Sequence, residues 1–142
     1  MRKILIVYWS GTGNTETMAK KLAEGAGSAG AETVLKPVSG ATLDMVREAG
    51  ALAFGCPAMG AEILEDGEME PFISGLTKAD VDGKPVGLFG SYDWGDGQWM
   101  RDWVGRMKDL GAIVDGEGVI AQLEPSGEAL DQCYELGKRL AG

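Results

Sequence analysis

The 142-residue sequence contains no histidine and only two cysteines. Without histidine, the chain cannot form a Ser-His-Asp triad, a Cys-His pair or a histidine-bound metal site. Cys56 and Cys133 are too few and too far apart for a disulfide framework or a cysteine metal motif. We interpret both as small buried apolar residues. Because no base or cation lies near Cys56 in the sequence, we expect no catalytic thiolate.

Long apolar runs are also absent, and acidic residues outnumber basic ones. No segment has the length of apolar residues that a membrane span requires. The chain enters an apolar run directly after Lys3, unlike a signal peptide. The net charge of -9 disfavours nucleic acid and anionic membranes and favours partners with a basic patch. Acidity that only keeps the protein soluble is the simpler interpretation of that charge taken alone. We expect a cytoplasmic monomer.

Short apolar runs alternate with segments of helical periodicity from end to end. The runs are nearly continuous, which is typical of strands in a parallel sheet with both faces covered. The predicted strands are Ile4–Trp9, Thr33–Val38, Ala51–Gly55, Pro85–Ser91 and Val119–Leu123. Five strand–helix units without a linker or repeat predict one doubly wound α/β domain over residues 1–142. It would hold a five-stranded parallel sheet with helices on both faces.

Apolar residues three and four positions apart predict the helices between these strands. The first helical stripe runs from Thr15 to Ala26, and we expect Gly25 and Gly27 to end that helix. Ser126 has the residue type of an N-cap for the last helix. The other predicted helices are 43–48, 69–76, about 98–110 and 129–140.

Ligands of doubly wound sheets bind outside the carboxyl ends of the strands, so three loops form the candidate site. These loops are Ser10–Thr15, Cys56–Asp66 and Ser91–Gly97. The first consists of small, hydroxyl-bearing or amide-bearing residues without a charge, between a strand and the start of a helix. Neutral side-chain donors and backbone N–H groups at a helix N-terminus favour an anion, most plausibly a phosphate group.

Two common nucleotide motifs do not fit this first loop. A P-loop needs a lysine that the loop lacks, which argues against nucleoside triphosphate hydrolysis. The dinucleotide fingerprint needs a third glycine where the sequence has Glu16. A nest of neutral donors that holds one phosphate monoester fits instead. The alternative is a capped turn that binds nothing, which the density of donor side chains makes the poorer interpretation.

Met59 and Trp94 lie in the middle of the second and third loops, between small or polar residues. A loop tryptophan is more often a packing anchor than a ligand contact. Two large polarizable side chains on opposite sides of a phosphate site nevertheless suggest a flat ring held between them. A phosphate together with a flat ring indicates a mononucleotide cofactor.

Three motifs, in sequence order, carry a family resemblance. They are Tyr8-Trp9-Ser10-Gly11-Thr12-Gly13-Asn14-Thr15, Ala58-Met59-Gly60-x-Glu62 and Gly90-Ser91-Tyr92-x-Trp94-Gly95-Asp96-Gly97, followed by Trp99-Met100-Arg101-Asp102. Together they resemble the short-chain flavodoxins of the clostridial type over nearly the whole chain, and no long insertion interrupts the fifth strand. The resemblance implies the flavodoxin-like strand order 2-1-3-4-5 and a non-covalently bound FMN.

The resemblance also implies the contacts with FMN. The loop Ser10–Thr15 would hold the phosphate, while Met59 and Trp94 would enclose the isoalloxazine. Glu62 would accept a hydrogen bond from flavin N3–H. The carbonyl of Gly60 would turn toward flavin N5 after uptake of one electron and a proton, which stabilises only the neutral semiquinone. The expected FMN-binding residues are Ser10, Gly11, Thr12, Gly13, Asn14, Thr15, Ala58, Met59, Gly60, Ala61, Glu62, Ser91, Tyr92, Asp93, Trp94 and Gly95.

Such a protein carries one electron at a time at low potential, cycling mainly between the neutral semiquinone and the anionic hydroquinone. Acidic residues near the loops support this, because they disfavour a second negative charge on the flavin. If these acids form only a solvated surface, the repulsion is weaker. The acids, with no cation among them, are Glu62, Glu65, Asp66, Glu68, Glu70, Asp93 and Asp96. We expect no enzyme activity, and we expect redox partner proteins with basic docking patches, such as reductases and other oxidoreductases.

Two positions depart from the family pattern. Ala61 stands where relatives often have a polar residue, and a type II turn at Gly60 would force Ala61 to a positive φ. A left-handed alanine costs roughly 1 kcal/mol, equivalent to about 40 mV for one electron, so we expect a lower semiquinone potential. Asp93 stands where relatives often have glycine, and it adds a carboxylate beside Trp94.

Two other functions on the same fold are alternatives. A flavodoxin-like quinone or nitro reductase would use FMN and a nicotinamide. It usually needs extra loops and a subunit interface, for which 142 residues leave little room. A receiver domain needs an acidic pair after the first strand and an aspartate at the end of the third. Those places hold Ser10-Gly11 and Gly55-Cys56, which excludes a receiver.

Overall fold

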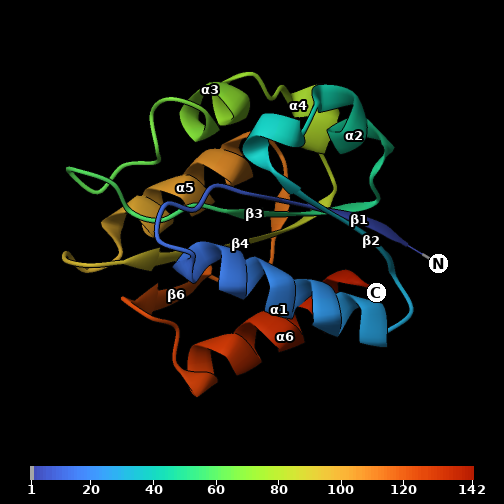
Figure 1. Cartoon of the computed structure of the whole chain (residues 1–142). Coiled ribbons are helices and arrows are strands. Elements are labelled where there is room, and N and C mark those ends of the chain that lie inside the picture. The colour runs from blue at the N-terminus through green and yellow to red at the C-terminus, as the bar shows by residue number, and fades with distance from the viewer. Residues whose placement is uncertain (1) are drawn as a thin grey trace.

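The computed structural model describes residues 2–142 and shows one parallel sheet between two layers of helices (Figure 1). The strands are β1 (Lys3–Tyr8), β2 (Glu32–Pro37), β3 (Ala51–Gly55), β4 (Pro85–Tyr92), β5 (Ile113–Val114) and β6 (Val119–Gln122). The helices are α1 (Asn14–Ser28), α2 (Leu43–Glu48), α3 (Met69–Ser74), α4 (Lys78–Val81), α5 (Gln98–Asp109) and α6 (Gly127–Leu140), with a 3-10 turn, η1, at Val38–Gly40. Within residues 2–142, no helix combines the length and apolar character needed to cross a membrane.

The strand order β2-β1-β3-β4-β5 confirms the predicted doubly wound parallel sheet, with one difference at its last position. There β5 and β6 both pair with β4 in parallel. The short β5 pairs with the start of β4, at Pro85 and Val86, and β6 pairs with its end, from Phe89 to Tyr92. The sequence pattern predicted only the second of these strands. Two residues are too few to show the periodicity of a strand.

All the predicted helices are present. Helix α2 has the predicted bounds, and α3 and α5 end slightly before the predicted residues. The Ser126 Oγ accepts a hydrogen bond from the Ala129 N–H at 3.2 Å, which confirms Ser126 as the N-cap of α6. Helix α4 was not predicted, because four residues show no periodicity. Its sequence signal is the capping box that Thr77 and Asp80 form at its start.

Alternate residues of β1, an interior strand of the sheet, enter two different cores. Leu5 and Val7 lie in the core covered by α2, α3, α4 and α5, while Ile4 and Ile6 lie in the core covered by α1 and α6. Figure 1 shows α1 and α6 together on one side of the sheet and the other helices on the opposite side. Burial on both faces explains why the strands show no alternation of apolar and polar residues.

Helices α1 and α6 approach each other closely at two glycines. A Cβ atom on Gly25 would lie 1.9 Å from the Tyr134 carbonyl oxygen, and one on Gly137 would lie 2.1 Å from the Leu22 carbonyl oxygen. The expectation that Gly25 and Gly27 end α1 is wrong, because the helix continues through both of them. Packing against α6 stabilises this glycine-rich end, which intrinsic propensity alone disfavours.

We expect Gly25→Ala to lower the free energy of unfolding by about 1–3 kcal/mol, because the added methyl group overlaps the backbone of α6. Gly27→Ala is the matched control, since it lies in the same helix and its Cβ position has no atom within 4 Å. There alanine should stabilise the protein by roughly 0.5–1 kcal/mol. Urea unfolding of both variants measures the difference, and equal effects would contradict a packing role for Gly25.

Candidate functional site

The hydrogen-bond ladder of the sheet continues past the ends of β1 and β3 into the loops that follow them, against the last residues of β3 and β4. The Trp9 N–H donates to the Gly55 carbonyl at 3.0 Å, and the Ala58 N–H donates to the Ser91 carbonyl at 3.0 Å. The three predicted loops therefore leave the sheet from one shared edge and lie side by side. This is the edge at which doubly wound sheets bind their ligands.

Between these loops lies a cavity of about 150 Å³. Its lining residues are Trp9, Gly11, Thr12, Asn14, Pro57, Ala58, Met59, Ser91, Tyr92 and Asp93. Only Trp9 and Pro57 were not among the predicted site residues. Their positions in the sequence could have indicated that they line the site, because each lies within two residues of the carboxyl end of a strand that precedes a candidate loop.

The Ser10 side chain shapes the first loop. Its Oγ accepts hydrogen bonds from the N–H groups of Gly13 at 3.1 Å and Glu16 at 3.3 Å. Gly13 has a φ of 96°, a conformation that favours glycine. The loop N–H groups that have no acceptor within residues 2–142 are those of Ser10, Gly11, Thr12 and Thr15. Free donors at the start of a helix fit an anion.

The buried side chain of Thr15 joins the first loop to the third. Its Oγ1 lies 3.2 Å from the Ser91 Oγ and accepts a hydrogen bond from the Ser91 N–H at 3.3 Å. The Thr15 hydroxyl thus holds the two loops together. The expected contact of Thr15 with a phosphate stays a prediction. Because the hydroxyl is already bonded to Ser91, the free N–H group of Thr15 is the donor best placed to make that contact.

The second loop contains a tight turn between Met59 and Ile63. The Met59 N–H donates to the Ile63 carbonyl at 2.8 Å, and the Ile63 N–H donates back at 3.0 Å. Between them, Gly60 has a φ of 48° and Glu62 a φ of 57°, whereas Ala61 keeps a negative φ. A left-handed conformation is uncommon for glutamate and costs roughly 1–2 kcal/mol. The positive φ expected at Ala61 belongs to the turn with the Gly60 carbonyl rotated toward the flavin, and it stays a prediction.

The Glu62 carboxylate connects the second loop to the third. Its Oε1 accepts a hydrogen bond from the Gly97 N–H at 3.2 Å, at the start of α5, where the helix dipole favours a negative charge. Gly95 has a φ of 91°, and a Cβ atom there would lie 2.2 Å from the same Oε1. Glycine at position 95 therefore serves both the turn and the close approach of Glu62. The expected contact of Glu62 with flavin N3–H stays a prediction.

The two expected ring contacts lie in different surroundings. Met59 is half-buried and lines the cavity. Trp94 is 61% exposed and is not among the residues that line the cavity. Tyr92 does line it, and its ring packs against Trp99 with 5.5 Å between the centroids. An enclosing role for Trp94 stays a prediction.

Cys56 is buried beneath the second loop, as expected. Burial raises the pKa of its thiol to about 12, and its Sγ accepts a hydrogen bond from the Glu65 N–H at 3.3 Å. The Glu65 carboxylate accepts hydrogen bonds from the N–H groups of Gly67, Glu68 and Met69. Burial alone would raise the pKa of Glu65, but these three bonds outweigh it and lower that pKa. Both residues therefore hold the second loop in place.

Two acidic residues of the site, Asp96 and Glu70, have cationic partners that the sequence did not reveal. Arg101 donates to the Asp96 carboxylate at 2.9 Å, and Arg106 donates to the Glu70 carboxylate at 2.8 Å. Both arginines lie on α5, so the expectation of no cation among these acids is corrected. Ion pairs as exposed as these weaken the negative field only modestly. The acids without an ion pair in residues 2–142 are Glu62, Glu65, Asp66, Glu68 and Asp93.

Comparison with known proteins identifies the family. The flavodoxin family model matches residues 6–137. This chain belongs to the flavodoxin family. A flavodoxin from Clostridium beijerinckii is 47% identical over 96% of this chain and 97% of the relative, and one from Megasphaera elsdenii is 43% identical over 96% of each. These relatives place the chain with the short-chain flavodoxins, as the sequence motifs predicted.

Solved flavodoxin structures share the fold. The solution structure of two-electron reduced Megasphaera elsdenii flavodoxin is 42% identical, with a TM-score of 0.85 over 97% of this chain and 98% of that one. A flavodoxin from the domain Archaea is 27% identical, with a TM-score of 0.89 over 98% of this chain and 96% of that one. Flavodoxins are electron carriers that bind FMN, and FMN is the cofactor of this flavodoxin.

The residues present fit FMN on two observations. The free N–H groups at the start of α1 offer an uncharged site for a phosphate monoester. Beside them, the half-buried side chains of Met59 and Tyr92 line a cavity in which an aromatic ring system can lie. Donors that fit a phosphate and side chains that fit a ring therefore lie next to each other at one edge of the sheet.

We expect Gly95→Ala to weaken FMN binding about tenfold, because alanine strains the turn and displaces the Glu62 carboxylate. Gly105→Ala is the control, because Gly105 lies in α5 and its Cβ position has no atom within 4 Å. Fluorescence titration of FMN with each apoprotein measures the affinity. An unchanged affinity of the Gly95 variant would show that the contact between Glu62 and the third loop does not support the site.

Proposed function

We propose that this flavodoxin is an electron carrier and not an enzyme, and that it transfers one electron at a time at low potential. It would cycle mainly between the neutral semiquinone and the anionic hydroquinone of non-covalently bound FMN, whose ring supplies the redox chemistry. The observation that carries the proposal is the cavity at the carboxyl ends of β1, β3 and β4. An uncharged, donor-rich loop lies on one side of it and acidic loops lie on the other.

The loop Ser10–Thr15 would bind the phosphate group. Its free N–H groups and the N-terminal end of the α1 dipole supply the positive potential that a lysine would otherwise provide. Ser10 holds the loop in shape through its bonds to Gly13 and Glu16. Since the loop contains no cation, its positive potential would come from backbone dipoles alone and would fall off within the first turn of α1.

The second and third loops would hold the ring. Met59 and Trp94 would enclose it, and the Glu62 carboxylate would accept a hydrogen bond from its N3–H edge. Glu62 could do so and keep its hydrogen bond to Gly97 at the start of α5. That bond uses Oε1, and Oε2 has no hydrogen-bond partner within residues 2–142. The exposed Trp94 would lose solvent contact when the ring is bound.

The Gly60 carbonyl would accept a hydrogen bond from flavin N5 when that atom carries a proton. The paired ends of the turn, Met59 and Ile63, can stay in place while the peptide between Gly60 and Ala61 rotates. A contact that exists in one protonation state stabilises that state relative to the others. Because the unpaired acids beside the cavity disfavour additional negative charge, they would lower the potential of the second electron.

A stepwise reductive titration of the purified protein, followed by absorption spectroscopy, tests this function. We expect a yellow protein that turns blue at one electron and pale at two. A colourless protein that does not take up FMN would refute the proposal. Steady oxidation of NAD(P)H by the pure protein would instead favour the alternative, a quinone or nitro reductase.

We expect Ala61→Gly to raise the potential of the first electron by about 40 mV, because glycine adopts the positive φ that the rotated turn requires. Ala61→Asn should shift this potential in the same direction by a smaller amount, since asparagine tolerates a left-handed conformation better than alanine. A spectroelectrochemical titration of FMN in the three proteins measures the shift. An unchanged or lower first potential in both variants would contradict strain at Ala61.

The surroundings of the carrier are proposed from its charge. We propose a cytoplasmic monomer whose donor and acceptor proteins present basic patches, because complementary charge speeds encounter between proteins. The same net charge of -9 disfavours nucleic acid and anionic membranes as partners. Salt dependence of the electron-transfer rate would report this steering.

A further inference from the structure

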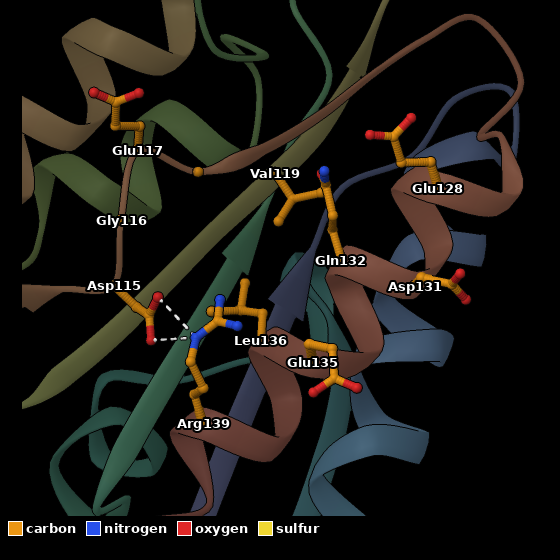
Figure 2. Close-up of a pocket in the computed structure, with 11 residues that line it drawn as sticks. Asp115, Gly116, Glu117, Val119, Glu128, Asp131, Gln132, Glu135, Leu136 and Arg139 are labelled. Carbon is orange, nitrogen blue, oxygen red and sulfur yellow. Dashed lines mark hydrogen bonds and ion pairs between the residues drawn. The ribbon is translucent and has the colours of Figure 1, made fainter.

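A second hollow lies apart from the cofactor cavity, between α6 and the loop that joins β5 to β6. Its volume is about 630 Å³, compared with about 150 Å³ for the cofactor cavity. Figure 2 shows Asp115 and Glu117 on the loop side, the helix opposite, and the side chains of Val119 and Leu136 between them. An adjoining hollow of about 350 Å³ continues along β6. We call the two hollows, whose lining residues lie between Asp115 and Arg139, the edge groove.

Carboxylates line both walls of the edge groove. Its only cation within residues 2–142 is Arg139, whose Nε lies 3.1 Å from Asp115 (Figure 2). Glu135 has a looser partner in Lys138, at 3.8 Å. The lining acids without an ion pair in the described residues are Glu117, Glu124, Glu128 and Asp131. Glu128 and Asp131 are three residues apart on α6, a spacing at which like charges repel each other, and a cationic occupant would relieve that repulsion.

The edge groove also follows an open strand edge. Strand β6 pairs with β4 on one side, and no strand of residues 2–142 pairs with its other side. In a parallel strand, alternate residues direct both N–H and C=O away from the partner strand, so an open edge offers donors and acceptors in a row. Val119 and Ala121 of this strand are buried, and with Ala129 and Leu136 they give the groove an apolar floor.

We propose that the edge groove binds an extended, basic segment of a partner protein. The segment would add a strand to the open edge of β6 and place its Lys or Arg side chains against the unpaired carboxylates. Main-chain hydrogen bonds give such a contact its register, and the acidic walls select the charge of the side chains.

Other occupants match only part of this surface. Nucleic acid and anionic lipid are repelled by the carboxylates of both walls. A polyamine supplies positive charge and donors but has no acceptor for the N–H groups along β6. For a metal ion, no group of three or more suitable side chains occurs within residues 2–142.

The edge groove leads toward the cofactor loops. At the end of β6, the Gln122 Nε2 donates to the Asp93 carbonyl at 3.1 Å, and the Leu123 N–H donates to the Tyr92 carbonyl at 2.7 Å. A segment bound along β6 therefore ends beside the third loop, where a partner would exchange electrons with FMN. That last step rests on the proposed function, whereas binding in the groove does not.

Titration of the FMN-loaded protein with a synthetic peptide of four Lys-Val repeats, followed by ¹H–¹⁵N NMR, tests the proposal. We expect chemical-shift changes in residues 117–122 and along α6. The variant Glu117→Gln/Asp131→Asn removes one unpaired carboxylate from each wall and should weaken binding about five- to tenfold. The control Glu32→Gln/Glu48→Gln makes the same change of net charge at exposed sites on β2 and α2, and should weaken it less than about twofold.

Two further probes separate the other occupants. The same peptide with alternate backbone nitrogens methylated cannot pair with β6, so we expect it to lose the shifts at residues 119–122. Equal binding of spermidine, equal weakening in the control variant, or shifts confined to the three cofactor loops would each overturn the proposal. Failure of the starting protein to hold FMN would refute the proposed function alone, because the groove shares no lining residue with the cofactor cavity.

Discussion

The parallel ladder through β1, β3 and β4 extends beyond the ends of β1 and β3, and the cofactor cavity depends on that extension. Because Ala58, after the end of β3, still bonds to Ser91 near the end of β4, the second loop leaves the sheet beside the third. The Thr15 hydroxyl then ties the first loop to the same Ser91, and Glu62 ties the second loop to the start of α5. Each loop is thus held by its neighbours, and the sheet, buried on both faces, holds them all.

The same edge separates two kinds of electrostatic environment. The phosphate loop is neutral and uses backbone dipoles, which attract one anion without adding a cation to the site. The loops opposite carry carboxylates, of which those of Asp96 and Glu70 are partly balanced by arginines of α5. On the proposed function, a carrier built this way would hold its cofactor at one end and oppose extra negative charge at the other. The edge groove adds a further acidic surface that begins where these loops end.

Sequence reasoning succeeded where the signal is local and failed where it depends on a partner element. The apolar runs predicted the five long strands, and the composition of the first loop predicted its free donors. Gly25 was taken for a helix end because its neighbour across the helix interface, Tyr134, is 109 residues away and invisible to periodicity. The pairing of Asp96 with Arg101 was missed for a related reason, since residues five apart across a helix start meet only in the folded turn.

The sequence by itself determined the doubly wound sheet, the flavodoxin family and the three loops that form the site. These follow from periodicity and from motifs, which are properties of short stretches of chain. Only the tertiary structure decided that Thr15 bonds to Ser91, that Gly95 makes room for Glu62, and that an acidic groove follows the open edge of β6. Such contacts join residues distant in the chain, and the distances between them are set by how strands and helices pack.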